Sequence, residues 1–198
     1  MIEDKNIPAS TTAPIKTFII IHGTKGSPEG NWFPWLAAEL KKLGKKVFVP
    51  RMPTPDGQNL TQWLAALKEQ VGDIDSQTCI IGHSIGAVFL LRYLEQALVP
   101  LGASVFVAGL TGAIGIPEYD SLNSTFVGSG YDWPQIKSNA GRILCIAGDN
   151  DPYVPISQPI EMANMLGVSL KIIQGGGHLN AESGHFAFPE LLEELGDT

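Results

Sequence analysis

Positive charge, cysteine and long apolar runs are all scarce in this sequence, and each shortage excludes a class of protein. The 198 residues include 13 Lys and Arg against 20 Asp and Glu, a formal net charge of −7. No basic cluster is present that would displace counterions from phosphate, so nucleic acid and anionic membrane are excluded as main partners. The longest basic patch, Lys41-Lys42 with Lys45-Lys46, is typical of the C-terminal end of a helix.

The two cysteines, Cys79 and Cys145, lie inside apolar runs. This pattern excludes a disulfide framework and predicts buried, small apolar side chains, so we expect a reducing compartment, the cytoplasm. No segment reaches the roughly 18 apolar residues of a membrane span, and the N-terminal stretch lacks the apolar core of a signal peptide. We expect residues 1–15 to form a flexible tail and residues 16–198 to form a single domain.

Beyond the tail, short apolar runs alternate with helical patterns, which is typical of βαβ units on a parallel sheet. The fold class is therefore predicted to be α/β: a doubly wound, mostly parallel six-stranded sheet with helices on both faces. The predicted strands are residues 17–21, 46–50, 78–82, 104–108, 142–147 and 169–174. The predicted helices are residues 31–43, 60–71, 84–96, 159–166 and 189–195.

One stretch, CIIGHSIGAVFLLRYL at residues 79–94, interrupts an apolar run with a serine between two glycines. The pattern G-x-S-x-G at the end of a strand and the start of a helix indicates a nucleophile elbow. Its tight turn strains the serine backbone and brings strand and helix together, so Gly82 and Gly86 stand where a Cβ would collide. Ser84 is the predicted nucleophile.

A serine nucleophile needs a base, and the sequence offers four histidines: His22, His83, His178 and His185. His178 follows the last predicted strand, in QGGGHLNAE, where a loop can return over the sheet edge, and is the best candidate. His83 is expected to point away from its neighbour Ser84. His22 is expected to shape the loop after the first strand, and His185 to face solvent or pack at a helix start.

The base in turn needs an acid that fixes its tautomer. AGDNDPYVP follows the fifth predicted strand and offers two carboxylates, Asp149 and Asp151. We favour Asp151, because two prolines brace the loop around it, with Asp149 as the alternative or as a cap of the turn. The order Ser84, Asp151, His178 is the order that accompanies the G-x-S-x-G elbow.

Acyl transfer also requires backbone donors for an oxyanion. We expect one donor to be the amide of Ile85, directly after the nucleophile. The second is expected in the loop after the first strand, HGTKGSPEG, most plainly the amide of Thr24, since Gly23 lets that backbone approach closely.

With these motifs in place, the chain resembles the α/β-hydrolase superfamily and, more narrowly, the small serine hydrolases related to retinoblastoma-binding protein 9. The matching stretches cover most of residues 17–195: HGTKGSPEGNWFPWLAAEL, VPRMPTPDGQNLTQWL, IIGHSIGAVFLLRYLE, YDWPQIKSNAGRILCIAGDNDPYVP and GGGHLNAESGHFAFPEL. The resemblance implies a minimal hydrolase fold without a large cap domain, and it assigns the triad to Ser84, Asp151 and His178. The retinoblastoma-binding pattern L-x-C-x-E is absent, so a pocket-protein partner is not supported.

The aromatic residues after the predicted oxyanion loop are candidates for the substrate pocket. Asn31 and Trp32 are expected to line it, while Phe33 and Trp35 fit better in the core.

The glycine-rich segment 111–133 is expected to form a short loop over the site. Tyr131 and Trp133 are further candidates for its lining.

The sequence thus predicts a serine hydrolase, without metal or cofactor, that acts on small acyl esters through an acyl-enzyme on Ser84. Two alternatives remain open: a thioesterase or peptidase, and a non-catalytic binding module on a hydrolase scaffold. No oligomeric state is favoured.

Overall fold

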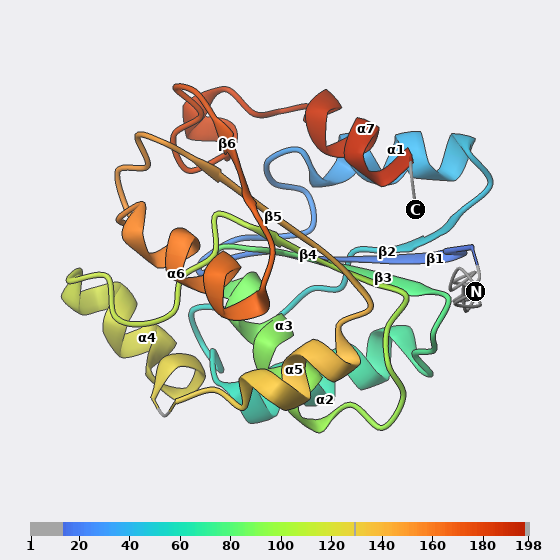
Figure 1. The fold of residues 1–198 in the computed structure, drawn as a ribbon, viewed down its shortest axis with the longest axis horizontal. Coiled ribbons are helices and arrows are strands. Elements are labelled where there is room, and N and C mark those ends of the chain that lie inside the picture. The colour runs from blue at the N-terminus through green and yellow to red at the C-terminus, as the bar shows by residue number, and fades with distance from the viewer. Residues whose placement is uncertain (1–13, 129, 197–198) are drawn as a thin grey trace, which may run out of the picture.

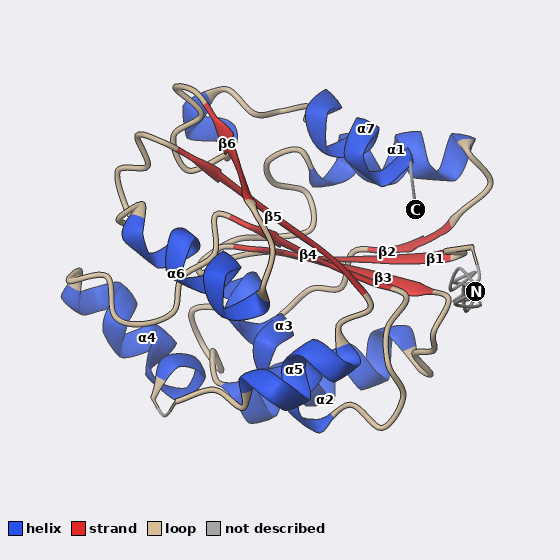
Figure 2. Cartoon of the chain, viewed as in Figure 1, coloured by secondary structure: helices blue, strands red, loops and turns tan. Residues whose placement is uncertain are grey.

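Six parallel strands form one sheet in the order β2-β1-β3-β4-β5-β6 (Figures 1 and 2). The computed structural model describes residues 14–128 and 130–196, so most of the expected N-terminal tail lies outside the described residues. The strands are β1 Thr17–Ile21, β2 Lys46–Phe48, β3 Thr78–His83, β4 Ala103–Val107, β5 Arg142–Gly148 and β6 Leu170–Ile173. The predicted α/β fold with a parallel six-stranded sheet is confirmed.

Helices cover both faces of the sheet. Helices α1 (Phe33–Lys42) and α7 (Pro189–Gly196) lie on one face, while α2 (Leu60–Val71), α3 (Ile85–Gln96), α5 (Trp133–Asn139) and α6 (Ser157–Leu166) lie on the other (Figure 2). Helix α4 (Pro117–Val127) packs against α3, and a short 3-10 turn, η1 (Ala181–Ser183), precedes α7. No large cap domain is present in the described part of the chain.

Strand β1 shows why the sequences of the strands are continuous apolar runs. Ile19 and Ile21 belong to the core beneath α2 and α3, whereas Phe18 and Ile20 belong to the core beneath α1 and α7. Successive side chains of a strand point to opposite faces, and both faces here are covered, so no polar alternation is left in the sequence.

The first and last residues of the predicted helices and strands mostly agree with the structure to within two residues. The helix over 60–71 and the strand over 17–21 are as predicted, whereas the strand over 46–50 ends at Phe48 and the helix over 31–43 begins at Phe33. Lys41 and Lys42 occupy the last turn of α1, as predicted.

The largest correction concerns residues 111–133. This segment is not a short loop, because it contains α4 and the first residue of α5. Helix α4 buries only Asn123 and Phe126, so its sequence lacks the apolar stripe by which a helix is recognised.

Both cysteines are free and buried, as predicted. Burial raises the pKa of each thiol to about 12, so neither is a thiolate at neutral pH. Among the helices of residues 14–128 and 130–196, none has the length and apolar character needed to cross a membrane.

The strand order places a crevice at the carboxyl edge of the sheet. β1 pairs with β2 on one side and with β3 on the other, so the chain leaves β1 and β3 in opposite directions. A reversal of this kind is where open parallel sheets bind their ligands. The loop after β1 and the turn after β3 therefore meet at the expected position of a site.

Candidate active site

Ser84 occupies the turn between β3 and α3 with a backbone conformation that side chains rarely adopt. Its φ is 57° and its ψ is −122°, and its amide donates to the Val107 carbonyl at 2.9 Å. The turn ends the strand and begins the helix within one residue, so the hydroxyl projects at the carboxyl edge of the sheet. This geometry is that of the predicted nucleophile elbow.

The two flanking glycines are required by close backbone contacts. A Cβ at position 82 would lie 2.3 Å from the Gly86 carbonyl oxygen, and one at position 86 would lie 2.5 Å from the Ile21 carbonyl oxygen. Both neighbours are backbone atoms that cannot move aside. The elbow therefore depends on G-x-S-x-G for steric reasons, as the sequence predicts.

His178 and Asp151 come together from loops after β6 and β5. The His178 Nδ1–H donates to Asp151 Oδ2 at 2.7 Å, and both side chains are nearly buried. The other carboxylate oxygen, Oδ1, accepts from the amides of Tyr153 and Val154 at 2.8 and 3.0 Å. With Nδ1 engaged in this way, Nε2 is the ring nitrogen left to exchange a proton with a substrate or nucleophile.

The surroundings of Asp151 keep it ionised. Burial raises the pKa of this carboxyl, but the His178 hydrogen bond and charge and the two amide donors outweigh burial, so the pKa lies below its ordinary value. The carboxylate can therefore hold the imidazole in one tautomer and stabilise an imidazolium.

Ser84 and His178 line the same cavity, but the serine is not hydrogen-bonded to the imidazole. Within the described residues, the Ser84 hydroxyl has no side-chain partner within hydrogen-bonding distance. Catalytic hydrogen bonds are often long before substrate binds, so this separation is compatible with a Ser–His pair that tightens around a substrate.

The loop after β1 approaches the elbow closely. A Cβ at Gly23 would lie 3.0 Å from Ser84 Cβ and 3.4 Å from its Oγ, so glycine allows this approach. His22 stays in the core and donates from Nδ1 to the Gly23 carbonyl at 2.8 Å, while its Nε2 accepts from the Met52 amide at 3.0 Å. His22 thus shapes this loop, as predicted.

The two predicted oxyanion donors belong to this junction. Ile85 is the first residue of α3, where helix geometry leaves the amide without an acceptor inside the helix. Thr24 lines the cavity, and its hydroxyl donates to Asn123 Oδ1 at 2.7 Å.

Hydrogen bonds from residues distant in the sequence hold Thr24 and its loop in place, and nothing in the sequence indicated them. The Gln58 side-chain amide donates to Asn123 Oδ1 at 2.7 Å and to Thr24 Oγ1 at 3.1 Å, and the Lys25 amide donates to Thr54 Oγ1 at 2.7 Å. Asn123 belongs to α4 and is 4% exposed. These contacts fix the loop after β1, and no pattern in a single sequence links residues so far apart.

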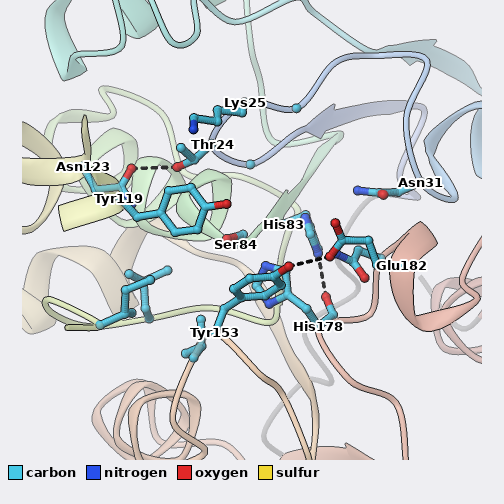
Figure 3. A pocket seen from close by; sticks show the side chains of 16 residues that line it. Thr24, Lys25, Asn31, His83, Ser84, Tyr119, Asn123, Tyr153, His178 and Glu182 are labelled. Carbon is cyan, nitrogen blue, oxygen red and sulfur yellow. Dashed lines mark hydrogen bonds between the residues drawn. The ribbon is translucent and has the colours of Figure 1, made fainter. Parts of the chain in front are cut away.

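The cavity over Ser84 has a volume of about 250 Å³. Tyr119 and Tyr153 lie edge to face with ring centroids 6.2 Å apart, and Ser84 is seen between them in Figure 3. The Tyr153 hydroxyl donates to Glu182 Oε2 at 2.6 Å, and this bond raises the pKa of Tyr153 to about 12. The remaining wall is part apolar and part polar, and its members include Leu110, Ile114, Val154, Lys25, Asn31 and Asn180.

Of the residues predicted to line the pocket, Asn31 lies in the cavity wall, whereas Trp32 and Trp133 do not. Asn31 lines the cavity, but its Oδ1 accepts from the Ala181 amide at 2.9 Å. Trp32 is completely buried between Phe33 and Phe188, so it belongs to the core and not to the cavity wall.

Trp133 also lies away from the cavity. It is half-buried at the start of α5 and packs on Tyr131, whose ring in turn contacts the guanidinium of Arg92 on α3 at 4.2 Å. Helix α4 was not predicted from the sequence. It contributes Tyr119 and Asn123 to the cavity wall, where Tyr131 and Trp133 were expected.

The other candidates have structural roles. His83 is buried and donates from Nε2 to the His178 carbonyl at 2.9 Å. His185 packs on Phe188 just before α7, and Asp149 Oδ1 accepts from the Gly175 amide at 2.7 Å. Within residues 14–128 and 130–196, no three His, Cys, Asp or Glu side chains are grouped so as to hold a metal ion.

Comparison with known proteins agrees with this geometry. The family model described as serine hydrolase matches residues 18–197. The YdeN protein of Bacillus subtilis (strain 168) is 31% identical over 182 residues, which cover 91% of this chain and 94% of that protein. The serine hydrolase RBBP9 of Rattus norvegicus is 26% identical over 170 residues, which cover 84% of this chain and 89% of that one.

The crystal structure of YdeN superposes on the fold with a TM-score of 0.84 at 28% identity and covers 92% of this chain and 100% of that chain. The family match over almost the whole chain agrees with the geometry of the site. Ser84 and His178 line one cavity, and Asp151 is hydrogen-bonded to His178. The chain belongs to the serine hydrolase family.

Proposed function

We propose that the protein hydrolyses carboxylic esters of small acyl groups, with Ser84 as nucleophile, His178 as base and Asp151 as the acid that orients it. The observation that carries this proposal is the 2.7 Å hydrogen bond between Asp151 Oδ2 and Nδ1 of His178, a residue that lines the same cavity as Ser84. Membership of the serine hydrolase family supports the same chemistry.

In the first step, Ser84 Oγ attacks the ester carbonyl while its proton passes to His178 Nε2. The carbonyl oxygen becomes an oxyanion, which the amides of Ile85 and Thr24 would stabilise. Collapse of this intermediate breaks the ester bond, and His178 returns the proton to the leaving alcohol. Water, deprotonated by His178, then attacks the acyl-enzyme, and His178 returns that proton to Ser84 Oγ as the bond to serine breaks and the acid is released.

The size of the cavity supports a short acyl chain. Its volume of about 250 Å³ lies below the roughly 300–1,000 Å³ of ordinary ligand sites. The rings of Tyr119 and Tyr153 form part of its wall. We therefore expect acetyl and butyryl esters to be cleaved faster than octanoyl esters.

A panel of p-nitrophenyl esters of increasing chain length tests this function. We expect the ratio kcat/KM to fall with chain length, and Ser84→Ala to abolish turnover. Ser76→Ala changes an exposed serine just before β3, at the opposite edge of the sheet, and serves as the matched control. Thioesters and peptide amides in the same panel distinguish a thioesterase or peptidase, and a folded protein that cleaves none of them would favour a binding module.

A further inference from the structure

The loop that carries His178 has little intrinsic rigidity. Residues 175–177 are three consecutive glycines, and Leu179, directly after the base, has a left-handed φ of 50°. Glycine widens the range of accessible conformations, and a left-handed leucine persists only where its surroundings impose it. The position of His178 must therefore be imposed by contacts from outside the loop.

Three side chains from other parts of the chain bind the backbone at and just after His178. His83 Nε2–H donates to the His178 carbonyl at 2.9 Å, a contact visible in Figure 3. Trp32 Nε1–H donates to the Leu179 carbonyl at 2.9 Å. Asn31 Oδ1 accepts from the amide of Ala181 at 2.9 Å. We call His83, Trp32 and Asn31 the loop clamp.

The two ring donors of the loop clamp are themselves held rigidly. Trp32 is 0% exposed and contacts Phe33 and Phe188 edge to face. The His83 ring is 3% exposed and packs against Trp32, Phe33 and the ring of His178, the last at a centroid distance of 4.9 Å. Neither donor can follow the loop if the loop moves, so both act as fixed reference points.

The state of His83 argues against a packing role alone. Burial lowers its pKa to about 3, so the ring is neutral and carries one N–H, which the His178 carbonyl accepts. Its other nitrogen, Nδ1, is buried without a hydrogen-bond partner among the described residues. An apolar ring would fill this space without burying an unsatisfied nitrogen, so the single hydrogen bond to the loop is the property that distinguishes histidine here.

The position of His83 in the chain explains why its hydrogen bond to the His178 carbonyl matters for the site. His83 is the last residue of β3 and directly precedes Ser84. Its hydrogen bond therefore joins the loop of the base directly to the strand that precedes the nucleophile.

We propose that the loop clamp positions the imidazole of His178 relative to Ser84, and that His83, Trp32 and Asn31 are positioning residues. This inference rests on the proposed function, because it assigns the clamp to the same hydrolytic site. It gives Trp32, which is absent from the cavity wall, a role through the backbone of the loop, and it adds such a role to Asn31, which also lines the cavity.

The test compares His83→Phe, which keeps an aromatic ring but removes the donor, with His83→Gln, whose side-chain amide can restore a donor near the position of Nε2. For each variant we would measure the rate constant for labelling by a fluorophosphonate, together with kcat and KM for a short p-nitrophenyl ester. We expect His83→Phe to lower the labelling rate and kcat by about tenfold to a hundredfold, the order of effect of a misplacement of about 1 Å. KM should change little, and His83→Gln should recover most of the rate.

Ser104→Ala is the matched control, because Ser104 is also completely buried and donates to a backbone carbonyl, that of Ala140, at 2.8 Å. It lies in β4 away from the cavity, so its loss should affect stability but not kcat. Trp32→Phe and Asn31→Ala repeat the test at the other two points of the clamp and cover the case in which His83→Phe does not fold.

Folded variants that label within about twofold of the wild type, while the wild type itself reacts, would overturn the loop clamp and leave the proposed function intact. A loss of rate that His83→Gln does not recover would also count against the hydrogen bond as its cause. A wild-type protein that does not react with the fluorophosphonate would instead overturn the proposed function, and this inference with it.

Discussion

The backbone of Ser84 is strained, and other residues near the cavity also have strained, left-handed backbone conformations. Among the described residues, five non-glycine residues have a positive φ: Lys25, Asn31, Ser84, Ala108 and Leu179. Three of these line the cavity, and Leu179 directly follows His178. Conformations of this kind raise the energy by about 1–3 kcal/mol each and tend to cluster where function requires a particular geometry.

Substitution of Gly86 tests the steric basis of the elbow. A Cβ there would meet the Ile21 carbonyl oxygen at 2.5 Å, so Gly86→Ala is expected to lower the free energy of unfolding by about 1–3 kcal/mol or more. Urea denaturation measures the change. Gly112→Ala is the control, since a Cβ at that position has no atom within 4 Å among the contacts described. Equal stability of the two variants would refute the steric explanation.

Asp151→Asn tests the role of the carboxylate. The amide can keep the shape of the side chain but cannot stabilise an imidazolium, so kcat for ester cleavage is expected to fall by about 10⁴-fold. Asp149→Asn is the matched control, because Asp149 does not contact His178 and an asparagine keeps the oxygen that accepts from the Gly175 amide. A larger loss at position 149 than at position 151 would reverse the assignment of the acid.

The same residue predicts a pH dependence of stability. The folded-state pKa of Asp151 lies below its ordinary value of about 4, so the ionised carboxylate stabilises the fold above that pH. This stabilisation is lost as the pH falls through the folded-state pKa. We expect the difference in urea midpoint between wild type and Asp151→Asn to be greatest above pH 4 and to shrink towards pH 2. A difference that grows on acidification would contradict the assignment.

Helix α4 places two residues over the site. Tyr119 faces Tyr153 across the cavity, and Asn123 receives hydrogen bonds from Thr24 and Gln58. A salt bridge between Lys25 and Glu118 joins the helix to the loop after β1. The helix therefore fixes both one wall of the cavity and the loop that is expected to supply an oxyanion donor.

Asn123→Ala tests this support. Without the shared acceptor, Thr24 and Gln58 lose their common partner, and the backbone of the loop is expected to move away from the oxyanion position. We expect kcat to fall by about tenfold with KM nearly unchanged, as for loss of an interaction made in the transition state. Ser124→Ala, on the exposed side of the same helix, should leave both constants unchanged. Equal effects of the two substitutions would contradict the role of Asn123.

Secondary structure could be predicted where burial leaves a regular pattern. Helix α2 has apolar residues at helical spacing, and Asn59 caps its start by accepting from the Gln62 amide. Helix α4 could not be recognised, because it buries two residues only and lies between glycine-rich stretches. The cavity residues of α4 were missed for the same reason.

The positions of the candidate catalytic residues were more predictable than the residues that line the cavity. Ser84, Asp151 and His178 each lie at or after the carboxyl end of a predicted strand, and the carboxyl ends of parallel strands meet at one edge of the sheet, so all three could be expected at that edge. Trp32 is an aromatic residue of the kind that lines pockets, but it lies in the core, because its ring packs on Phe33 and Phe188 and its N–H binds the Leu179 carbonyl. That packing joins residues far apart in the sequence and leaves no local signal.

The molecule as a whole is a parallel sheet whose carboxyl edge carries every candidate catalytic group. Ser84 follows β3, Asp151 follows β5 and His178 follows β6, while the loop after β1 lines the same cavity as Ser84 and His178. Both faces of the sheet are covered by helices, so the strands fix the relative positions of these loops. The proposed function therefore requires that the hydroxyl of Ser84 is activated by His178 and can form a covalent acyl bond.

The most direct test is the mass of the intact protein after reaction with a fluorophosphonate, followed by location of the adduct in the peptide that contains Ser84. We expect one adduct per chain at Ser84 in the wild type, none in Ser84→Ala and a much slower reaction in His178→Gln. A folded wild-type protein that gains no mass, or that is modified at a residue other than Ser84, would contradict the proposed function.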